Sequence, residues 1–144
     1  MKMAIIRIRG IRKIKPKIKK TLELLRLGKP NYCTIVDDSK ASMGMITVVN
    51  DYVAFGEIDG ETLFRLIYKR GMRGSKHIRE MYEKEKIMEM AKGIMDGKAK
   101  VSEVADPVFM LHPPRKGYKD TKRAYPRGDL GRRGDIGLLL RRMM

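Results

Sequence analysis

The sequence is poor in cysteine and tryptophan and lacks long apolar runs. It has 144 residues with one cysteine, Cys33, and no tryptophan. A single cysteine excludes an internal disulfide and a thiolate-rich metal site, and is typical of a reducing compartment. No stretch approaches the ~20 apolar residues that span a bilayer, and the first residues do not resemble a secretory signal. These absences predict a cytoplasmic protein that has no membrane partner.

The groups that catalysis requires are also scarce. The two histidines, His77 and His112, are far apart in the chain, and the carboxylates are scattered. No general acid–base pair, oriented nucleophile or phosphate-binding glycine loop emerges from their spacing. The sequence therefore predicts no enzyme activity, no catalytic residue, no metal, no cofactor and no small-molecule substrate.

Positive charge is what the sequence has in excess. There are 33 Lys and Arg against 17 Asp and Glu, which gives a formal net charge of +16. The excess is present in residues 1–60, 61–100 and 101–144 alike, so no detachable basic tail explains it. Hydrophobic residues make up 42% of the chain, which is ordinary for a globular protein. These features predict a folded, basic body with a polyanionic partner.

The first third of the chain alternates between strand and helix patterns. Residues 4–9 alternate apolar and basic side chains, which predicts a strand with a buried face and an open basic face. Pro16 and the spacing of Ile18, Leu22 and Leu25 predict a helix. Further strands are expected at 32–36 and 53–58.

Residues 41–52 fit both a strand and a helix. Thr47, Val48 and Val49 favour a strand by propensity. However, one helical stripe is formed by Met45, Val48, Val49 and Tyr52. We favour a helix. The resulting β-α-β-α-β order predicts crossovers with both helices on one face of a sheet and an open opposite face.

The remaining residues predict more helices and a basic loop. The expected elements are a helix at 61–71, helical structure at 75–95 with a break near 82–86, a short strand near 108–112, a basic loop at 113–134, and a closing helix at 135–143. The fold class is therefore α+β.

Two stretches concentrate the basic charge. Residues 7–20 hold eight Lys and Arg and no acid, and residues 115–133 hold another eight interleaved with Tyr118 and Tyr125. A solvated surface usually mixes signs, so both stretches indicate phosphate contact, and the tyrosines could also stack on bases. No helix-turn-helix, zinc-finger or zipper pattern appears. Folded RNA is favoured over the alternative, a DNA-binding architectural protein, and a small enzyme is the third hypothesis.

Several ordered segments resemble a known family. "MGMITVVNDYVAFGEID", "LIYKRG", "LHPPRKGYK" and "GDLGRRGDIGLLLRRMM" are similar to the large-subunit ribosomal protein L-thirty family, and most to its long archaeal form, which is related to the eukaryotic protein L-seven. The resemblance implies a ferredoxin-like β-α-β-α-β core at 1–59, a C-terminal extension at 60–144, and a helix at 41–52.

The resemblance also implies a function and an interface. It implies a structural constituent of the large ribosomal subunit, bound to large-subunit ribosomal RNA near 5S RNA and to neighbouring ribosomal proteins. It adds two residues of "LIYKRG" to the basic stretches. The residues predicted to contact RNA are Arg7, Arg9, Arg12, Lys13, Lys15, Lys17, Lys19, Lys20, Lys69, Arg70, Arg115, Lys116, Tyr118, Lys119, Lys122, Arg123, Tyr125, Arg127, Arg132 and Arg133.

Overall fold

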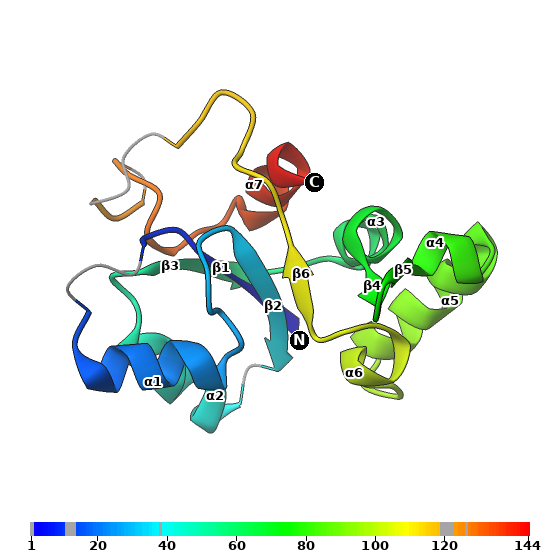
Figure 1. The fold of residues 1–144 in the computed structure, drawn as a ribbon, viewed down its shortest axis with the longest axis horizontal. Helices are drawn as coiled ribbons and strands as arrows, with labels where there is room; N and C mark the ends of the chain where they lie inside the picture. The colour runs from blue at the N-terminus through cyan, green and yellow to red at the C-terminus, as the bar shows by residue number, and fades with distance from the viewer. Residues whose placement is uncertain (1, 11–13, 38, 119–122, 126) are drawn as a thin grey trace.

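A five-stranded sheet organises the molecule (Figure 1). The computed structural model describes residues 2–10, 14–37, 39–118, 123–125 and 127–144. The strand order is β6-β2-β1-β3-β7, with bounds β1 Lys2–Arg7, β2 Tyr32–Asp37, β3 Val53–Glu57, β6 Val108–Met110 and β7 Gly131–Arg132. Helices cover both faces of this sheet, which confirms the predicted α+β fold class.

The central strand β1 runs antiparallel to both of its neighbours. Ile5 pairs with Thr34 of β2 and with Phe55 of β3. Of the two connections that join β1, β2 and β3, the one from β2 to β3 is therefore a crossover between strands of the same direction. The β1–β2 connection is not the predicted crossover, because residues 25–31 return the chain to the end of β1 before β2 begins. There the N–H of Asn31 donates to the Arg7 carbonyl at 2.7 Å.

Helices α1 (Pro16–Leu24) and α2 (Lys40–Val48) pack together on one face of the sheet, as Figure 1 shows. Their buried residues, Leu22 and Ile46, join Met3 and Ile5 of β1 in one apolar cluster. The ambiguous segment is helical. Ser39 caps it by accepting a hydrogen bond from the Ser42 N–H at 3.2 Å, and packing outweighs the strand propensity of its β-branched residues.

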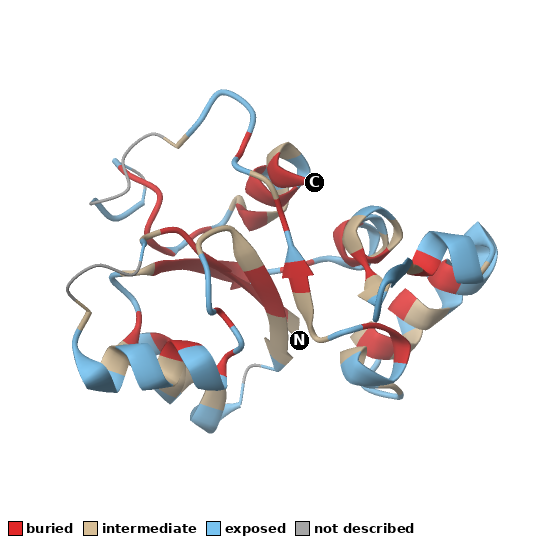
Figure 2. Cartoon of the chain, in the orientation of Figure 1, coloured by how far each residue is buried: buried red, intermediate tan, exposed pale blue. Residues whose placement is uncertain are grey.

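The opposite face is also covered, so the expectation of an open face is wrong. Helices α3 (Gly60–Arg70) and α7 (Ile136–Met143) pack there, and α5 (Lys84–Met95) packs against α3. Residues of all three helices join a second cluster that includes Ala4 and Ile6 of β1. Successive β1 residues thus enter different clusters. Figure 2 shows the result as continuous burial along the central strands. The alternating apolar and basic pattern predicted a single buried face for this strand, but both faces of β1 carry apolar residues that are buried.

Residues after 60 also extend the sheet. Strand β6 pairs with β2, and β7 pairs in parallel with β3. The remaining elements are a hairpin of β4 (Met72–Arg73) and β5 (Lys76–His77), with α4 (Ile78–Met81) and α6 (Val101–Val104). The predicted break in the 75–95 helix lies between α4 and α5, where Tyr82 is extended. The division into 1–59 and 60–144 stays a prediction.

A close backbone approach fixes the C-terminal helix on the sheet. The N–H of Arg133 donates to the Phe55 carbonyl at 2.8 Å. A Cβ built on Gly56 would lie 2.3 Å from the Arg133 carbonyl oxygen and 3.0 Å from Ile136 Cβ. Position 56 therefore requires glycine for α7 to reach β3. In the described part of the chain, no helix is long and apolar enough to cross a membrane.

Candidate nucleic-acid interface

Helix α1 and its N-cap present four lysines to solvent, spread around the exposed side of the helix. Ile18 and Leu22, one helical turn apart, pack into the cluster beneath α1, and this orientation turns the lysines outward. The exposed lysines on or beside α1 are Lys15, Lys17, Lys19 and Lys20. Within the described residues none of these four forms an ion pair. Their charge is therefore available to an external anion.

The start of α1 adds to this positive potential. Pro16 occupies the first turn, Lys15 makes no side-chain cap, and the first turn holds no acidic residue. The unpaired N–H groups of a helix N-terminus carry partial positive charge, which natural helices usually offset with Asp or Glu. A phosphate beside α1 would supply the missing negative charge.

Arg7 and Arg9 have different environments although they are two residues apart. Arg7 is 3% exposed, and its guanidinium donates to the carbonyls of Leu27 at 2.7 Å and Arg9 at 3.0 Å. Burial lowers its pKa, and its Nη2 atom has no hydrogen-bond partner among the described residues. Arg9 is half-buried with its guanidinium carbon 5.0 Å from the centre of the Tyr52 ring. Arg7 is thus an internal bracing residue, whereas Arg9 is accessible.

Arg133 is likewise used inside the protein. It is 5% exposed and donates to Asp129 at 2.8 Å and to both Asp135 oxygens at 2.8 and 3.0 Å. Burial alone would lower the pKa of Arg133, but the hydrogen bonds and charges of Asp135 and Asp129 outweigh burial and raise it. Its guanidinium also lies 5.1 Å from the centre of the Tyr125 ring. Arg133 therefore holds the basic loop in shape rather than facing an external partner.

Tyr118 anchors the other end of the loop. Its hydroxyl donates to Asn31 Oδ1 at 2.7 Å, and burial raises its pKa, so the hydroxyl stays neutral. Arg142 of α7 donates to the carbonyls of Arg115 at 2.7 Å and Gly117 at 2.6 Å. These contacts order residues 115–118 without any partner. We predicted Tyr118 as a stacking residue, but its hydroxyl and part of its surface are engaged within the fold.

The loop still exposes several cations. The exposed, described members are Arg115, Lys116, Arg123, Arg127 and Arg132. Among the described residues, the carboxylate that pairs with Arg132 is Glu57, at 4.0 Å. Tyr125 is 36% exposed, so part of its side chain can be reached by a base. Ala124, Tyr125 and Arg132 share a surface hollow with Asn50 of the α2–β3 turn, which places this part of the loop beside α2.

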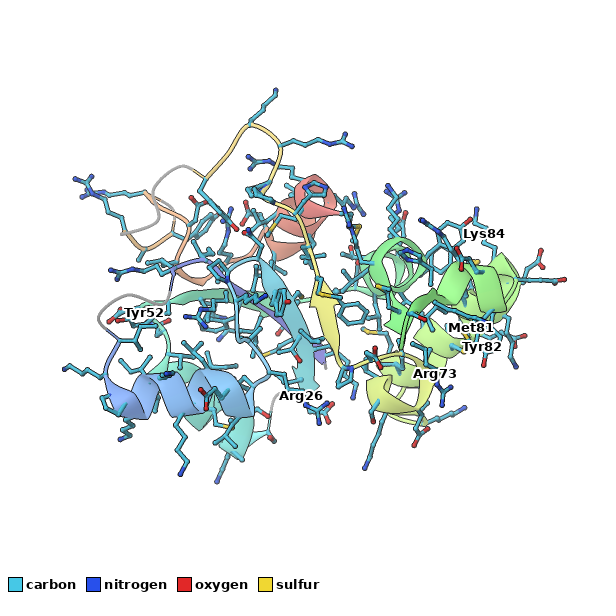
Figure 3. The ribbon with its side chains drawn as sticks, in the orientation of Figure 1. Arg26, Tyr52, Arg73, Met81, Tyr82 and Lys84 are labelled. Carbon is cyan, nitrogen blue, oxygen red and sulfur yellow. The ribbon has the colours of Figure 1, made fainter. Side chains whose placement is uncertain are left out.

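Lys69 and Arg70 lie away from α1. They form the last turn of α3, where their charges favour the negative end of the helix dipole. Because α3 packs on the face opposite α1, the structure separates these two cations from the lysines of α1. Figure 3 shows side chains extending at both ends of the molecule, with Tyr52 at the α1 end and Lys84 at the α5 end. Four predicted residues, Arg12, Lys13, Lys119 and Lys122, lie outside the described residues.

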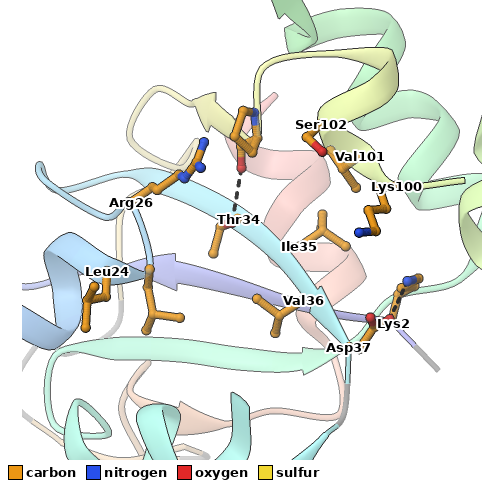
Figure 4. A pocket seen from close by; sticks show the side chains of 12 residues that line it. Lys2, Leu24, Arg26, Thr34, Ile35, Val36, Asp37, Lys100, Val101 and Ser102 are labelled. Carbon is orange, nitrogen blue, oxygen red and sulfur yellow. Dashed lines mark hydrogen bonds and ion pairs between the residues drawn. The ribbon is translucent and has the colours of Figure 1, made fainter. Parts of the chain in front are cut away.

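A basic hollow beside β2 was not predicted from the sequence. It has a volume of about 330 Å³ and is lined by Arg26, Lys100 and Lys2, with Asp37 and Thr34 of the strand. Figure 4 shows Arg26 and Lys100 reaching the same stretch of β2 from segments far apart in sequence, while Lys2 contacts Asp37. Arg26 adopts a left-handed φ of 63°. Neither residue belongs to a dense basic stretch, so no local signal marked them.

The described residues show no arrangement typical of catalysis. The Cys33 thiol is fully buried, and burial raises its pKa, so it is held in the unreactive protonated form. The ring nitrogens of His112 lie 2.7 and 2.6 Å from the carbonyls of Pro113 and Met144. Among the described residues, no three His, Cys, Asp or Glu side chains are grouped to hold a metal. The chemistry available is charge and stacking contact.

Comparison with known proteins gives one consistent result. The family model "Ribosomal protein L30p/L7e" matches residues 3–53. "Large ribosomal subunit protein uL30" of Archaeoglobus fulgidus is 46% identical, over 97% of this chain and 98% of the relative. The protein of the same name from Methanococcus maripaludis C5 is 41% identical, over 100% of this chain and 100% of the relative. The one from Thermoplasma acidophilum is also 41% identical, over 99% of this chain and 92% of the relative. These relatives are ribosomal proteins and not enzymes, and the resemblance seen in the sequence is confirmed: the chain belongs to the uL30 family of large-ribosomal-subunit proteins.

Proposed function

We propose that this protein is a structural constituent of the large ribosomal subunit that binds and stabilises folded ribosomal RNA. The observation that carries the proposal is the group of exposed lysines on and beside α1, which have no ion pair among the described residues: Lys15, Lys17, Lys19 and Lys20. Clustered lysines of this kind neutralise phosphates and release counterions. Membership of the uL30 family supports RNA as the polyanion.

The proposed interface is a refined version of the predicted set. Arg7 and Arg133 are left out because they are buried and bonded within the fold. Arg9, the exposed loop cations and Tyr125 remain, and Arg26 and Lys100 are added. Lys69 and Arg70 would serve a second contact on the α3 side, because one flat RNA surface cannot reach both faces of the sheet.

A charge reversal on α1 tests the proposal. The variant Lys19→Glu/Lys20→Glu should lose affinity for a folded large-subunit RNA fragment, measured by filter binding at fixed salt. Both lysines are exposed and the buried Leu22 is untouched, so α1 should keep its fold. The matched control is Lys84→Glu/Lys86→Glu, which makes the same charge change in the first turn of α5, at the end of the molecule remote from α1.

The two variants separate a specific surface from net charge. Near-wild-type binding by the α5 variant and a large loss in the α1 variant would support the interface. Equal losses would mean that only net charge matters, and this outcome would contradict the proposal. Competition between duplex DNA and the RNA fragment tests the alternative of a DNA-binding architectural protein, which requires the duplex to compete at least as well.

We further propose that the bound protein lies near 5S RNA and beside other ribosomal proteins. The support for this position is the family resemblance. A crosslinking map of the protein on intact large subunits should place its contacts within reach of 5S RNA. Contacts confined to distant regions of the subunit would contradict this position and leave the RNA-binding proposal standing.

A further inference from the structure

An apolar groove lies between α3 and α5, on the side of the sheet away from α1. Its floor is formed by Phe64, Met88, Ala91 and Met95, and its volume is about 370 Å³. Met88 is 49% exposed, although it is a large apolar residue. Figure 1 shows α5 at the end of the molecule remote from α1 and α2. The groove is thus separate from the lysines of the proposed RNA interface.

The rim of the groove has the opposite charge from the rest of the protein. It carries three carboxylates, Glu61, Glu89 and Asp96, and one ammonium, Lys92. Glu61 is paired with Arg65 at 2.9 Å. Glu89 and Asp96 have no ion pair with any residue that the structure describes. With Glu61 paired and Lys92 on the same rim, the groove keeps a small net negative charge in a chain of net charge +16.

The chemistry of the groove excludes RNA as its occupant. Phosphates would be repelled by Glu89 and Asp96, and the apolar floor offers no donor to a base or ribose. Exposed methionines form adaptable floors that accept apolar side chains of different shapes. The volume lies near the lower limit for ligand sites, about 300–1,000 Å³, and suits one or two large side chains.

We propose that this groove binds a basic polypeptide segment of another protein, which inserts a large apolar side chain over Met88 while its Lys or Arg residues pair with Glu89 and Asp96. The long-range repulsion between two basic proteins is screened within about 8 Å at physiological salt, so the nearby carboxylates dominate. The contact would let the protein hold RNA on one side and a protein neighbour on the other. It goes beyond the RNA-binding proposal, because it concerns another surface.

The first test observes the groove directly and needs no RNA. The full chain, labelled with ¹³C at its methionine methyl groups, is titrated with a short amphipathic peptide of Lys and Leu with blocked ends. The Met88 and Met95 signals should shift, while Met110, exposed on β6, should not. The counterpart peptide with Glu in place of Lys should leave the groove signals unchanged. Equal shifts with both peptides, or none with the Lys peptide, would overturn the proposal.

A variant test follows from the charges. Glu89→Lys/Asp96→Lys changes only exposed residues, and the two reversals should weaken binding of the Lys peptide about tenfold. The same variant should bind the RNA fragment at least as well as wild type. The variant Lys19→Glu/Lys20→Glu should bind the peptide normally. A groove variant with unchanged peptide affinity would refute the role of the two carboxylates.

A crosslinking test in the assembled subunit identifies the partner, and this arm rests on the proposed function. A photo-crosslinking amino acid replaces Met88, and a matched control replaces Leu24, which is 65% exposed on α1. Crosslinked peptides are sequenced by mass spectrometry. The Met88 position should capture a segment with Lys or Arg flanking an apolar residue. Capture of RNA, of an acidic segment, of a second copy of this chain, or of nothing would overturn the proposal. Failure of the chain to enter subunits at all would instead count against the proposed function.

Discussion

Neutralising three lysines of α1 should change how RNA binding responds to salt. The perturbation is Lys17→Gln/Lys19→Gln/Lys20→Gln. All three side chains are exposed, and none forms an ion pair among the described residues, so each is free to displace a counterion from a phosphate. Gln has nearly the same helix propensity as Lys, and the apolar side of α1 is untouched, so the fold should persist.

The magnitude follows from counterion release. Each duplex phosphate contact contributes about 0.9 to the slope of log affinity against log salt. Three contacts therefore contribute about 2.7. Between 50 and 200 mM salt, a fourfold change, wild type should lose roughly 40-fold more affinity than the variant. If only one lysine meets a phosphate, the slope should change by about 0.9.

The assay is fluorescence anisotropy of a labelled large-subunit RNA fragment over a series of KCl concentrations. The matched control is Lys84→Gln/Lys86→Gln/Lys98→Gln, which removes the same charge from exposed positions on and beside α5. The control should keep the wild-type slope. Identical slopes for all three proteins would refute the reasoning, because α1 would then release no counterions on binding. Equal decreases of the salt slope in both variants would refute the placement of the phosphate contacts on α1.

Three further predictions concern the fold. Gly56→Ala should lower the free energy of unfolding, measured by urea titration, by about 1–3 kcal/mol, because the added Cβ meets a backbone carbonyl of the β7–α7 connection. The control Gly28→Ala should lower it by less than about 0.5 kcal/mol, because a Cβ at position 28 faces open space. Hydrogen bonds from the Thr62 side chain and N–H lower the pKa of Asp59, so its stabilising effect is complete above the unfolded pKa of about 3.9. The stability advantage of wild type over Asp59→Asn should therefore begin to shrink near pH 4 and disappear only as pH falls through the lower, folded pKa; a difference that stays constant with pH would contradict the assignment. Tyr118→Phe should cost about 1 kcal/mol and speed amide exchange in residues 115–118 with little change in RNA affinity; a loss of affinity at unchanged stability would mean that its hydroxyl contacts RNA instead.

The local pattern predicted the helices and strands well where one signal dominated. Pro16 and the spacing of Ile18 and Leu22 predicted α1, because a helix needs only its own caps and a consistent apolar side. The segment 41–52 was ambiguous, since its β-branched residues suit a strand, and packing against β1 selected a helix that ends at Val48. Local patterns were also insufficient for the RNA interface. Arg26 and Lys100 line one hollow but are distant in sequence, so they come together only when the chain folds.

The sequence by itself determined the α+β order, the strong positive charge and the family, because each is a property of residue type and spacing. Only the tertiary structure decided which charges are available. Arg7 and Arg133 look like their basic neighbours in sequence, yet both are buried and bonded within the fold. Tyr118 is bound to Asn31, 87 positions away. Burial depends on contacts between segments distant in sequence, so local composition reports how much charge exists, while the folded chain sets where a partner can reach it.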